Sequence, residues 1–219
     1  MANIAVDVDD TLYSFSVLAR TKLVEMYKET GDKDYKEASY GPWMEWRSPP
    51  GILGVDKWLK VIDRCHTEEE ILKQSPFPYC KDVLRRLEEA GHELVYVSTR
   101  NPEAFFATAT WLRENDFPEG HLTCAYGDKT EATRDCKYMI DDRPKNLLQF
   151  VYDYHWTHRH GVLNVEHQRI GFALKTEYNF QLTDAPNIYL APDWNMLQYY
   201  LEKKGLIDAV ANESIVRLS

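Results

Sequence analysis

The stretch Ile4-Ala5-Val6-Asp7-Val8-Asp9-Asp10-Thr11-Leu12 lies near the start of the chain and decides the fold. It begins with three apolar residues and continues into carboxylates, which is typical of a buried parallel strand followed by its carboxyl end. Asp7 and Asp9 are two residues apart, so an extended chain points both side chains the same way. We therefore expect two carboxylates to face one ligand at the edge of a sheet.

The rest of the chain alternates short apolar runs with helical patterns. Strands are predicted over residues 94–97, 122–126, 137–140 and 188–190, and helices over 14–30, 101–114, 144–152 and 194–201. Such alternation indicates an α/β fold with a doubly wound, mainly parallel, Rossmann-like sheet. The segment 161–180 has a pattern closer to extended or hairpin structure.

Residues 13–76 interrupt this alternation. They hold helical patterns over 55–65 and 68–73, and an aromatic stretch rich in proline and glycine over 38–54, which predicts an irregular loop. We expect a small helical cap inserted after the first strand, above a core made of residues 1–12 and 77–205. Residues 206–219 are expected to form a C-terminal tail.

Charge and composition limit the classes of function. The chain has 219 residues, with 26 Lys and Arg against 35 Asp and Glu, a net charge of −9. An acidic chain is poorly suited to a long nucleic-acid footprint, so no extended nucleic-acid interface is expected. No apolar run approaches the roughly 20 residues that cross a bilayer, and we expect no membrane contact. The N-terminus has no leader pattern and the four cysteines show no metal-type spacing, so the cytoplasm is the expected location.

Polar side chains follow three of the predicted strands. Asp7 and Asp9 follow the first, Ser98, Thr99 and Arg100 the second, and Asp141 and Asp142 another, with Lys129 shortly before the last pair. Ligands of open α/β sheets bind outside these carboxyl ends. Carboxylates 4 Å apart repel by about 4 kcal/mol at an effective dielectric near 20, and a cation relieves that repulsion. All-oxygen ligands favour Mg²⁺ over zinc. The alternative is that these acids are only helix caps and loop residues.

These motifs resemble those of the haloacid dehalogenase (HAD) superfamily. The run from Asp7 to Leu12 is similar to its first motif, DxDx[TV][LV], and Ser98 and Lys129 to its second and third motifs. Ile140-Asp141-Asp142 resembles the acidic fourth motif. Within the superfamily, Asp141-Asp142-Arg143-Pro144 with a nearby upstream lysine is similar to the 5′(3′)-deoxyribonucleotidases. Those enzymes usually carry glycine where this chain has Asp10, and residues 13–76 show no match.

The resemblance and the chemistry of the residues imply a phosphatase mechanism. Asp7 is expected to attack phosphorus as the nucleophile, and Asp9 to act as general acid and then base. Mg²⁺ is expected on Asp7, the Asp9 backbone carbonyl and Asp142, with Asp141 as a less direct partner. Ser98 and the Thr99 amide are expected to bind the phosphoryl group, and Lys129 to neutralise charge. Lys137 is the rival lysine, but it begins a predicted strand and so lies far from its carboxyl end.

The substrate is expected to be a small phosphorylated molecule, most plausibly a (deoxy)nucleoside monophosphate. Tyr40, Trp43 and Trp46 are candidates for stacking on its base, which would contribute roughly 1–3 kcal/mol per ring; the alternative is that they form the core of the cap. Arg100 is a candidate substrate contact or a residue of the strand end. Competing functions are a polynucleotide 3′-phosphatase and a non-catalytic binding protein with this fold. The oligomeric state stays open.

Overall fold

The computed structural model describes residues 1–43, 48–125, 127–153 and 168–209. In these residues six strands form one sheet in the order β3-β2-β1-β4-β5-β6, and every neighbouring pair is parallel. The strands are β1 (Asn3–Val6), β2 (Glu93–Ser98), β3 (Gly120–Cys124), β4 (Cys136–Ile140), β5 (Ile170–Leu174) and β6 (Ile188–Ala191). The order reverses at β1, where the chain first runs outward to β3 and then returns to β4. The predicted doubly wound α/β fold is therefore confirmed.

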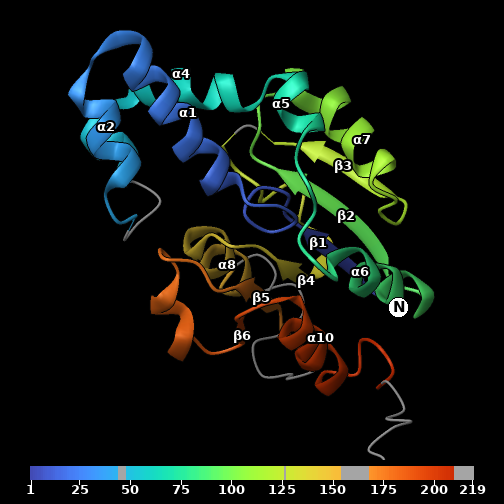
Figure 1. Cartoon of the computed structure of the whole chain (residues 1–219). Helices are drawn as coiled ribbons and strands as arrows, with labels where there is room; N and C mark the ends of the chain where they lie inside the picture. The colour runs from blue at the N-terminus through green and yellow to red at the C-terminus, as the bar shows by residue number, and fades with distance from the viewer. Residues whose placement is uncertain (44–47, 126, 154–167, 210–219) are drawn as a thin grey trace, which may run out of the picture.

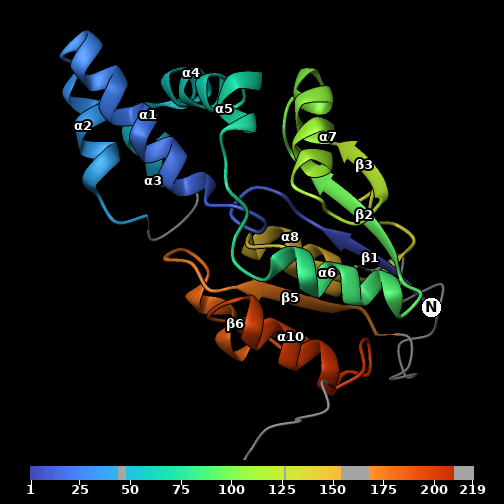
Figure 2. The same ribbon diagram turned by 45° about the vertical axis from the view of Figure 1, so that its right-hand side comes forward.

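Helices cover both faces of the sheet, and β1 lies at its centre. Ile4 and Val6 are fully buried and belong to the same cluster as the apolar side chains of α6 (Cys80–Glu89) and α10 (Trp194–Lys203). Ala5 points to the opposite face, where it clusters with residues of α8 (Pro144–Val151). Figures 1 and 2 show α6 and α10 on one side of the sheet and α8 on the other. This arrangement leaves the carboxyl ends of the strands uncovered by these three helices.

Five helices between β1 and α6 lie beyond those carboxyl ends (Figure 2). They are α1 (Phe15–Thr30), α2 (Lys33–Tyr40), α3 (Ser48–Leu53), α4 (Val55–Cys65) and α5 (Glu68–Leu72). The chain leaves and re-enters the sheet layer at one place, since the backbone N–H of Phe77 donates to the carbonyl of Leu12 at 2.7 Å. The division of the chain into core, cap and tail stays a prediction. Leu206 and Ile207, at the start of the expected tail, are buried.

Helix α7 (Phe105–Glu114) follows β2 and a short 3₁₀ turn, η1 (Pro102–Ala104). It packs against β3 and also against α5, so it links the five helices to the sheet. A second 3₁₀ turn, η3 (Phe180–Asp184), lies between β5 and β6. No helix among the described residues is long and apolar enough to cross a bilayer. Cys65, Cys80, Cys124 and Cys136 have free thiols.

One expectation about local structure was wrong, and a second was only partly right, since 170–174 is extended as expected but is not part of a hairpin. The stretch 38–54 is not one irregular loop: α2 extends to Tyr40, and α3 begins at Ser48. Pro49 and Pro50 lie in the first turn of α3, where backbone N–H groups have no acceptor within the helix, so proline is tolerated. The segment 161–180 contains no hairpin in its described part, because β5 is a parallel strand between β4 and β6. Residues 161–167 lie outside the described residues.

Candidate active site

The end of β1 fixes the first two carboxylates. The backbone N–H of Asp7 donates to the carbonyl of Ile140 at 2.8 Å, which continues the pairing of β1 with β4 by one residue. The chain then turns at Asp10, whose φ of 55° lies in the left-handed region. Aspartate tolerates this conformation better than most residues, and Asp10 Oδ1 accepts a hydrogen bond from the N–H of Ser16 at 2.8 Å. This geometry gives a physical reason for a glycine or a short polar residue at this position.

Lys129 contacts the first carboxylate directly. Its Nζ donates to Asp7 Oδ1 and to Asp141 Oδ2, the latter at 2.7 Å, and all three side chains are buried. Burial raises the pKa of Asp7 to about 6, with Asp141 and Asp9 adding to the rise and the Lys129 ammonium opposing it. The rival Lys137 lies within β4, with its Nζ 5.5 Å from the ring centroid of Tyr138. Of the two lysines, Lys129 is therefore the one at Asp7.

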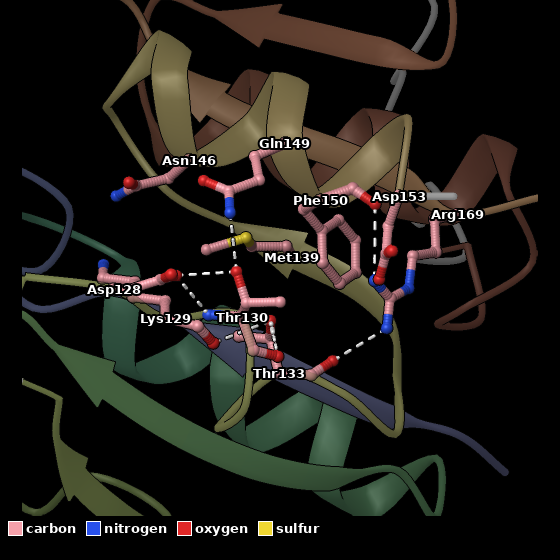
Figure 3. Close-up of a pocket in the computed structure, with 10 residues that line it drawn as sticks. All are labelled: Asp128, Lys129, Thr130, Thr133, Met139, Asn146, Gln149, Phe150, Asp153 and Arg169. Carbon is pink, nitrogen blue, oxygen red and sulfur yellow. Dashed lines mark hydrogen bonds and ion pairs between the residues drawn. The ribbon is translucent and has the colours of Figure 1, made fainter. Parts of the chain in front are cut away.

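The loop that carries Lys129 lies beneath α8 and is hydrogen-bonded to it, as Figure 3 shows. Thr130 Oγ1 accepts a hydrogen bond from Gln149 Nε2 at 2.7 Å, and Thr133 Oγ1 donates to the carbonyl of Lys129 at 3.0 Å. The guanidinium of Arg169 is buried next to this loop and donates to the carbonyl of Thr133 at 3.0 Å. These contacts come from α8 and from the start of β5. They hold the lysine in place against Asp7.

Three buried acids could hold a metal ion. One oxygen each from Asp7, Asp141 and Asp142 lie within 4.8 Å of one another. Burial raises the pKa of Asp142 well above its usual range, and the charges of Asp7 and Asp141 raise it further. A cation would relieve this repulsion, and an all-carboxylate set suits Mg²⁺.

The two neighbouring acids are not equivalent. Asp141 is already satisfied, because it accepts hydrogen bonds from Lys129 Nζ, from the N–H of Arg143 at 2.8 Å and from Asn146 Nδ2 at 3.0 Å. Asp142 Oδ1 is buried and has no hydrogen-bond partner among the described residues. An orphaned carboxylate oxygen beside other acids fits a metal ligand. This difference favours Asp142 over Asp141 as the direct ligand.

Two residues that hold Asp142 were missed in the sequence. The hydroxyl of Tyr178 lies between Asp142 Oδ2 and Asp10 Oδ2, 2.9 Å from the latter. Asn179 Nδ2 donates to the carbonyl of Asp142 at 2.9 Å. Both residues follow the carboxyl end of β5. Recognition of 170–174 as a buried parallel strand would have drawn attention to them.

Asp9 is held apart from the three-acid cluster by a basic partner. Arg100 Nη2 lies 2.8 Å from Asp9 Oδ1 and Arg100 Nε 3.0 Å from Oδ2. The hydroxyls of Tyr13 and Ser98 donate to the same carboxylate at 2.6 and 3.2 Å. Burial alone would raise the pKa of Asp9, but Arg100, His66 and Tyr13 together outweigh it and hold the pKa well below its usual range.

Arg100 has several partners besides Asp9. Its side chain is fully buried, and Nη1 donates to Thr108 Oγ1 at 2.6 Å while Nη2 also donates to the hydroxyl of Tyr13 at 2.8 Å. Arg100 is thus a partner of Asp9, and its contact with a substrate stays a prediction. Ser98 likewise directs its hydroxyl at Asp9 in this structure.

A cavity of about 360 Å³ lies next to this group, between α4 and the loop after β2. Thr99 and His66 line it, and His66 Nε2 is 3.9 Å from Asp9 Oδ2. Burial lowers the pKa of His66 to about 4, although the Asp9 carboxylate opposes the fall. His66 is a further residue near the site that the sequence reasoning did not single out.

The aromatic candidates of the predicted cap differ from one another. Trp43 is 1% exposed, its Nε1 donates to the carbonyl of Ala38 at 3.0 Å, and the Arg20 guanidinium lies 4.3 Å from its ring centroid. Its ring also meets Trp58 edge-on at 6.0 Å. Trp43 therefore contacts other residues of the helices through its ring and its N–H, which favours the alternative that it belongs to the core of the cap; stacking on a substrate stays a prediction. Tyr40 is 72% exposed, and Trp46 lies outside the described residues.

Comparison with solved structures identifies the fold. A HAD family hydrolase from Deinococcus radiodurans, solved with bound phosphate and sodium, matches with a TM-score of 0.57 at 13% identity. The match covers 95% of this chain and 98% of that one. The chain has the HAD fold. The resemblance drawn from the motifs is confirmed at the level of the fold, and the acids at β1 and β4 lie at the carboxyl ends of a HAD sheet.

Two bacterial relatives match part of this chain. It is 38% identical over 104 residues to a Bacillus cereus protein named "Putative nucleotidase", which covers 45% of this chain and 53% of the relative. It is 34% identical over 77 residues to an Oceanobacillus iheyensis protein of the same description, covering 32% of this chain and 41% of the relative. The chain thus spans about half the length of these relatives or less. No protein-family profile matches it.

Proposed function

We propose that this chain is a Mg²⁺-dependent phosphomonoester hydrolase that acts through an aspartyl-phosphate intermediate on (deoxy)nucleoside monophosphates. The observation that carries the proposal is the buried contact of Lys129 with Asp7, beside Asp141 and Asp142, at the carboxyl ends of β1 and β4. Further support comes from the names of the two bacterial relatives and from the phosphate bound to the Deinococcus hydrolase.

The first half-reaction transfers the phosphoryl group to the protein. A carboxylate oxygen of Asp7 attacks phosphorus, and the bond between phosphorus and the alcohol oxygen breaks. The alcohol oxygen takes a proton from Asp9, which acts as the general acid in this step. Lys129 neutralises charge on Asp7 and on the phosphoryl oxygens, and Ser98 and the Thr99 amide donate hydrogen bonds to those oxygens.

The second half-reaction releases inorganic phosphate. Asp9, now a carboxylate, accepts a proton from a water molecule, and the water oxygen attacks phosphorus. The bond between Asp7 and phosphorus breaks, which restores the Asp7 carboxylate. The ion pair with Arg100 favours the charged form of Asp9, which is the form that acts as general base in this half-reaction.

The acids present fit a magnesium ion. Asp7, the backbone carbonyl of Asp9 and the unpartnered Oδ1 of Asp142 would hold it, with Asp141 as a less direct partner. Bound there, Mg²⁺ supplies positive charge to the transferring phosphoryl group. Its removal by a chelator is expected to abolish phosphate release.

A phosphate-release assay tests the proposal. The panel holds deoxynucleotides, ribonucleotides, sugar phosphates, p-nitrophenyl phosphate and a 3′-phosphorylated oligonucleotide, each with MgCl₂ or with a chelator. We expect release from the nucleoside monophosphates and a loss of roughly 10³-fold or more in Asp7→Asn. The matched control is Asp184→Asn, an exposed aspartate at the end of η3, which should keep wild-type rates. A preference for the 3′-phosphorylated oligonucleotide would favour the polynucleotide 3′-phosphatase. If no phosphate is released from any ester, the alternative of a non-catalytic binding protein is favoured.

A further inference from the structure

The cavity of about 360 Å³ has walls from two separate parts of the chain. One wall comes from α4 and the turn after it, and the other from Thr99 and the start of η1. Thr99 directly follows Ser98, whose hydroxyl donates to Asp9. Two lining residues, Thr99 and His66, thus connect the cavity to the surroundings of Asp9, the carboxylate that is proposed to exchange a proton with the leaving alcohol. A cavity of this size is in the range of small-molecule sites.

His66 is a cavity residue whose side chain faces Asp9. Its ring packs on Phe15 with 5.3 Å between centroids, and its backbone N–H donates to the carbonyl of Ile62 at 2.9 Å, so both its backbone and its ring have contacts within the helices. Its Nε2 is buried and has no hydrogen-bond partner within the described residues. The 3.9 Å between Nε2 and Asp9 Oδ2 is too long for a hydrogen bond, so the ring nitrogen faces the carboxylate without bonding to it.

The charges around the cavity determine which chemical groups the alcohol part of a ligand can carry there. Asp63 and Glu103 line it, while the described lining includes no lysine or arginine. Leu59 and Ile62 add an apolar surface. A second phosphate or a carboxylate on the ligand would meet like charges with no cation to bind it. Hydroxyl and amino groups, by contrast, would find carboxylate acceptors.

We infer that His66 hydrogen-bonds the alcohol oxygen of the substrate, and that this cavity takes an uncharged alcohol rich in hydrogen-bond donors, such as a nucleoside, in preference to one that carries a second phosphate. This inference rests on the proposed phosphatase function. It assigns a substrate-binding role to a residue of α4–α5 and excludes nucleoside bisphosphates as good substrates.

The test compares a nucleoside 5′-monophosphate with the matching 3′,5′-bisphosphate on the full chain. Wild type should prefer the monophosphate in kcat/KM by about tenfold or more. His66→Leu should lower kcat/KM for the monophosphate by about tenfold, the order expected for one lost hydrogen bond. His66→Gln keeps a hydrogen-bonding side chain and should recover part of the loss. The effect of His66→Leu on p-nitrophenyl phosphate should be smaller, because p-nitrophenolate is a better leaving group than a nucleoside alkoxide and gains less from a hydrogen bond to the leaving oxygen.

Glu103→Gln provides a second test of the inference, and this test does not depend on whether the His66 variants fold. Removal of one negative charge should raise kcat/KM for the bisphosphate relative to the monophosphate several-fold. The control Glu114→Gln, at the exposed end of α7 and outside the cavity, should leave the ratio unchanged. Equal wild-type rates on both nucleotides, or a His66→Leu protein that folds and keeps wild-type kcat/KM, would overturn the inference. If wild type releases no phosphate even from p-nitrophenyl phosphate, it is the proposed function that fails.

Discussion

The guanidinium of Arg100 donates hydrogen bonds to both carboxylate oxygens of Asp9, with Nη2 2.8 Å from Oδ1 and Nε 3.0 Å from Oδ2. Two-point pairing of this kind fixes the plane of the carboxylate as well as its position. Tyr13 and Thr108 occupy further donors of the same guanidinium, so the arginine has little freedom to turn away. The orientation of Asp9 is thus set from β2 and α7 before any substrate binds.

Arg100→Gln is expected to destabilise the fold by about 3–5 kcal/mol at pH 7, because it leaves a buried carboxylate without its partner. The pKa of Asp9 is held below its ordinary value of 3.8 in the folded protein, so the pair contributes fully above pH 4 and is lost as the pH falls further. The difference from wild type should therefore shrink toward pH 3. Denaturant unfolding at both pH values measures it.

The control for this prediction is Arg113→Gln, which alters an exposed arginine at the end of α7 and should change the free energy of unfolding by less than about 0.5 kcal/mol. An Arg100→Gln protein as stable as wild type at pH 7 would contradict the importance of the pair.

Magnesium should stabilise the protein more at pH 7.5 than at pH 5. Burial raises the pKa of Asp7 from 3.8 to about 6, so between these values the metal-free folded protein binds more protons than the unfolded chain. The contribution of Asp7 to stability therefore falls as the pH rises through this window, and a metal ion that replaces the proton reverses the loss. The measurement is the shift in Tm on adding MgCl₂ at the two pH values.

Asp142→Asn should remove most of that Tm shift, whereas Asp184→Asn should keep it. A shift of the same size at pH 5 and pH 7.5 would argue against an ion on Asp7.

Tyr178→Phe should weaken magnesium binding by roughly tenfold or more, as expected when a residue that orients a metal ligand is lost. The hydroxyl of Tyr178 contacts both Asp142 and Asp10, so its removal frees the carboxylate of Asp142 to turn. Calorimetric titration with MgCl₂ gives the Kd directly. The matched control is Tyr152→Phe, whose hydroxyl lies on the surface, 3.4 Å from the carbonyl of Pro186. Equal Kd values for Tyr178→Phe and wild type would assign this tyrosine to packing alone.

Trp43→Ala should lower stability by about 3–5 kcal/mol, since it empties a buried indole site. Because the ring packs against Arg20 and Trp58, we expect KM for nucleotides and KM for p-nitrophenyl phosphate to change by the same factor. Tyr40→Ala serves as the comparison, because its exposed ring can be removed with little loss of Tm. A selective rise of KM for nucleotides in Trp43→Ala would show that the indole reaches the base after all.

The acids of the site could be predicted because they interrupt apolar strands. Asp7 and Asp142 each follow a short run of buried residues, and charge at such a position is conspicuous in a sequence. Lys129 was chosen over Lys137 on the same reasoning, from its place relative to a strand end. The region of β5 was expected to be extended or hairpin structure, but its place as a parallel strand of the sheet was not predicted, because no acidic residue directly follows its apolar run as Asp7 follows β1. Tyr178 and Asn179 were therefore not singled out.

Side-chain partners were harder to predict than strand ends. Asp9 and Arg100 are 91 residues apart, and nothing in either local sequence says that one binds the other. The burial of Trp43 likewise depends on an arginine from α1 and a tryptophan from α4, which only the folded helices bring together. Pairings of this kind depend on tertiary geometry, which the sequence patterns of strands and helices do not predict.

The single hydrogen bond between Phe77 and Leu12 closes the base of the five-helix segment, so the chain departs from the sheet and comes back at neighbouring backbone positions. A segment whose two ends already touch imposes no spacing on the layer beneath it, whatever its length. If residues 13–76 are the separate cap that the sequence predicts, we expect that other helices could replace most of them with little movement of Asp7, Lys129 or Asp142. New substrate preferences would then arise by exchange of a module, with the chemistry left in place.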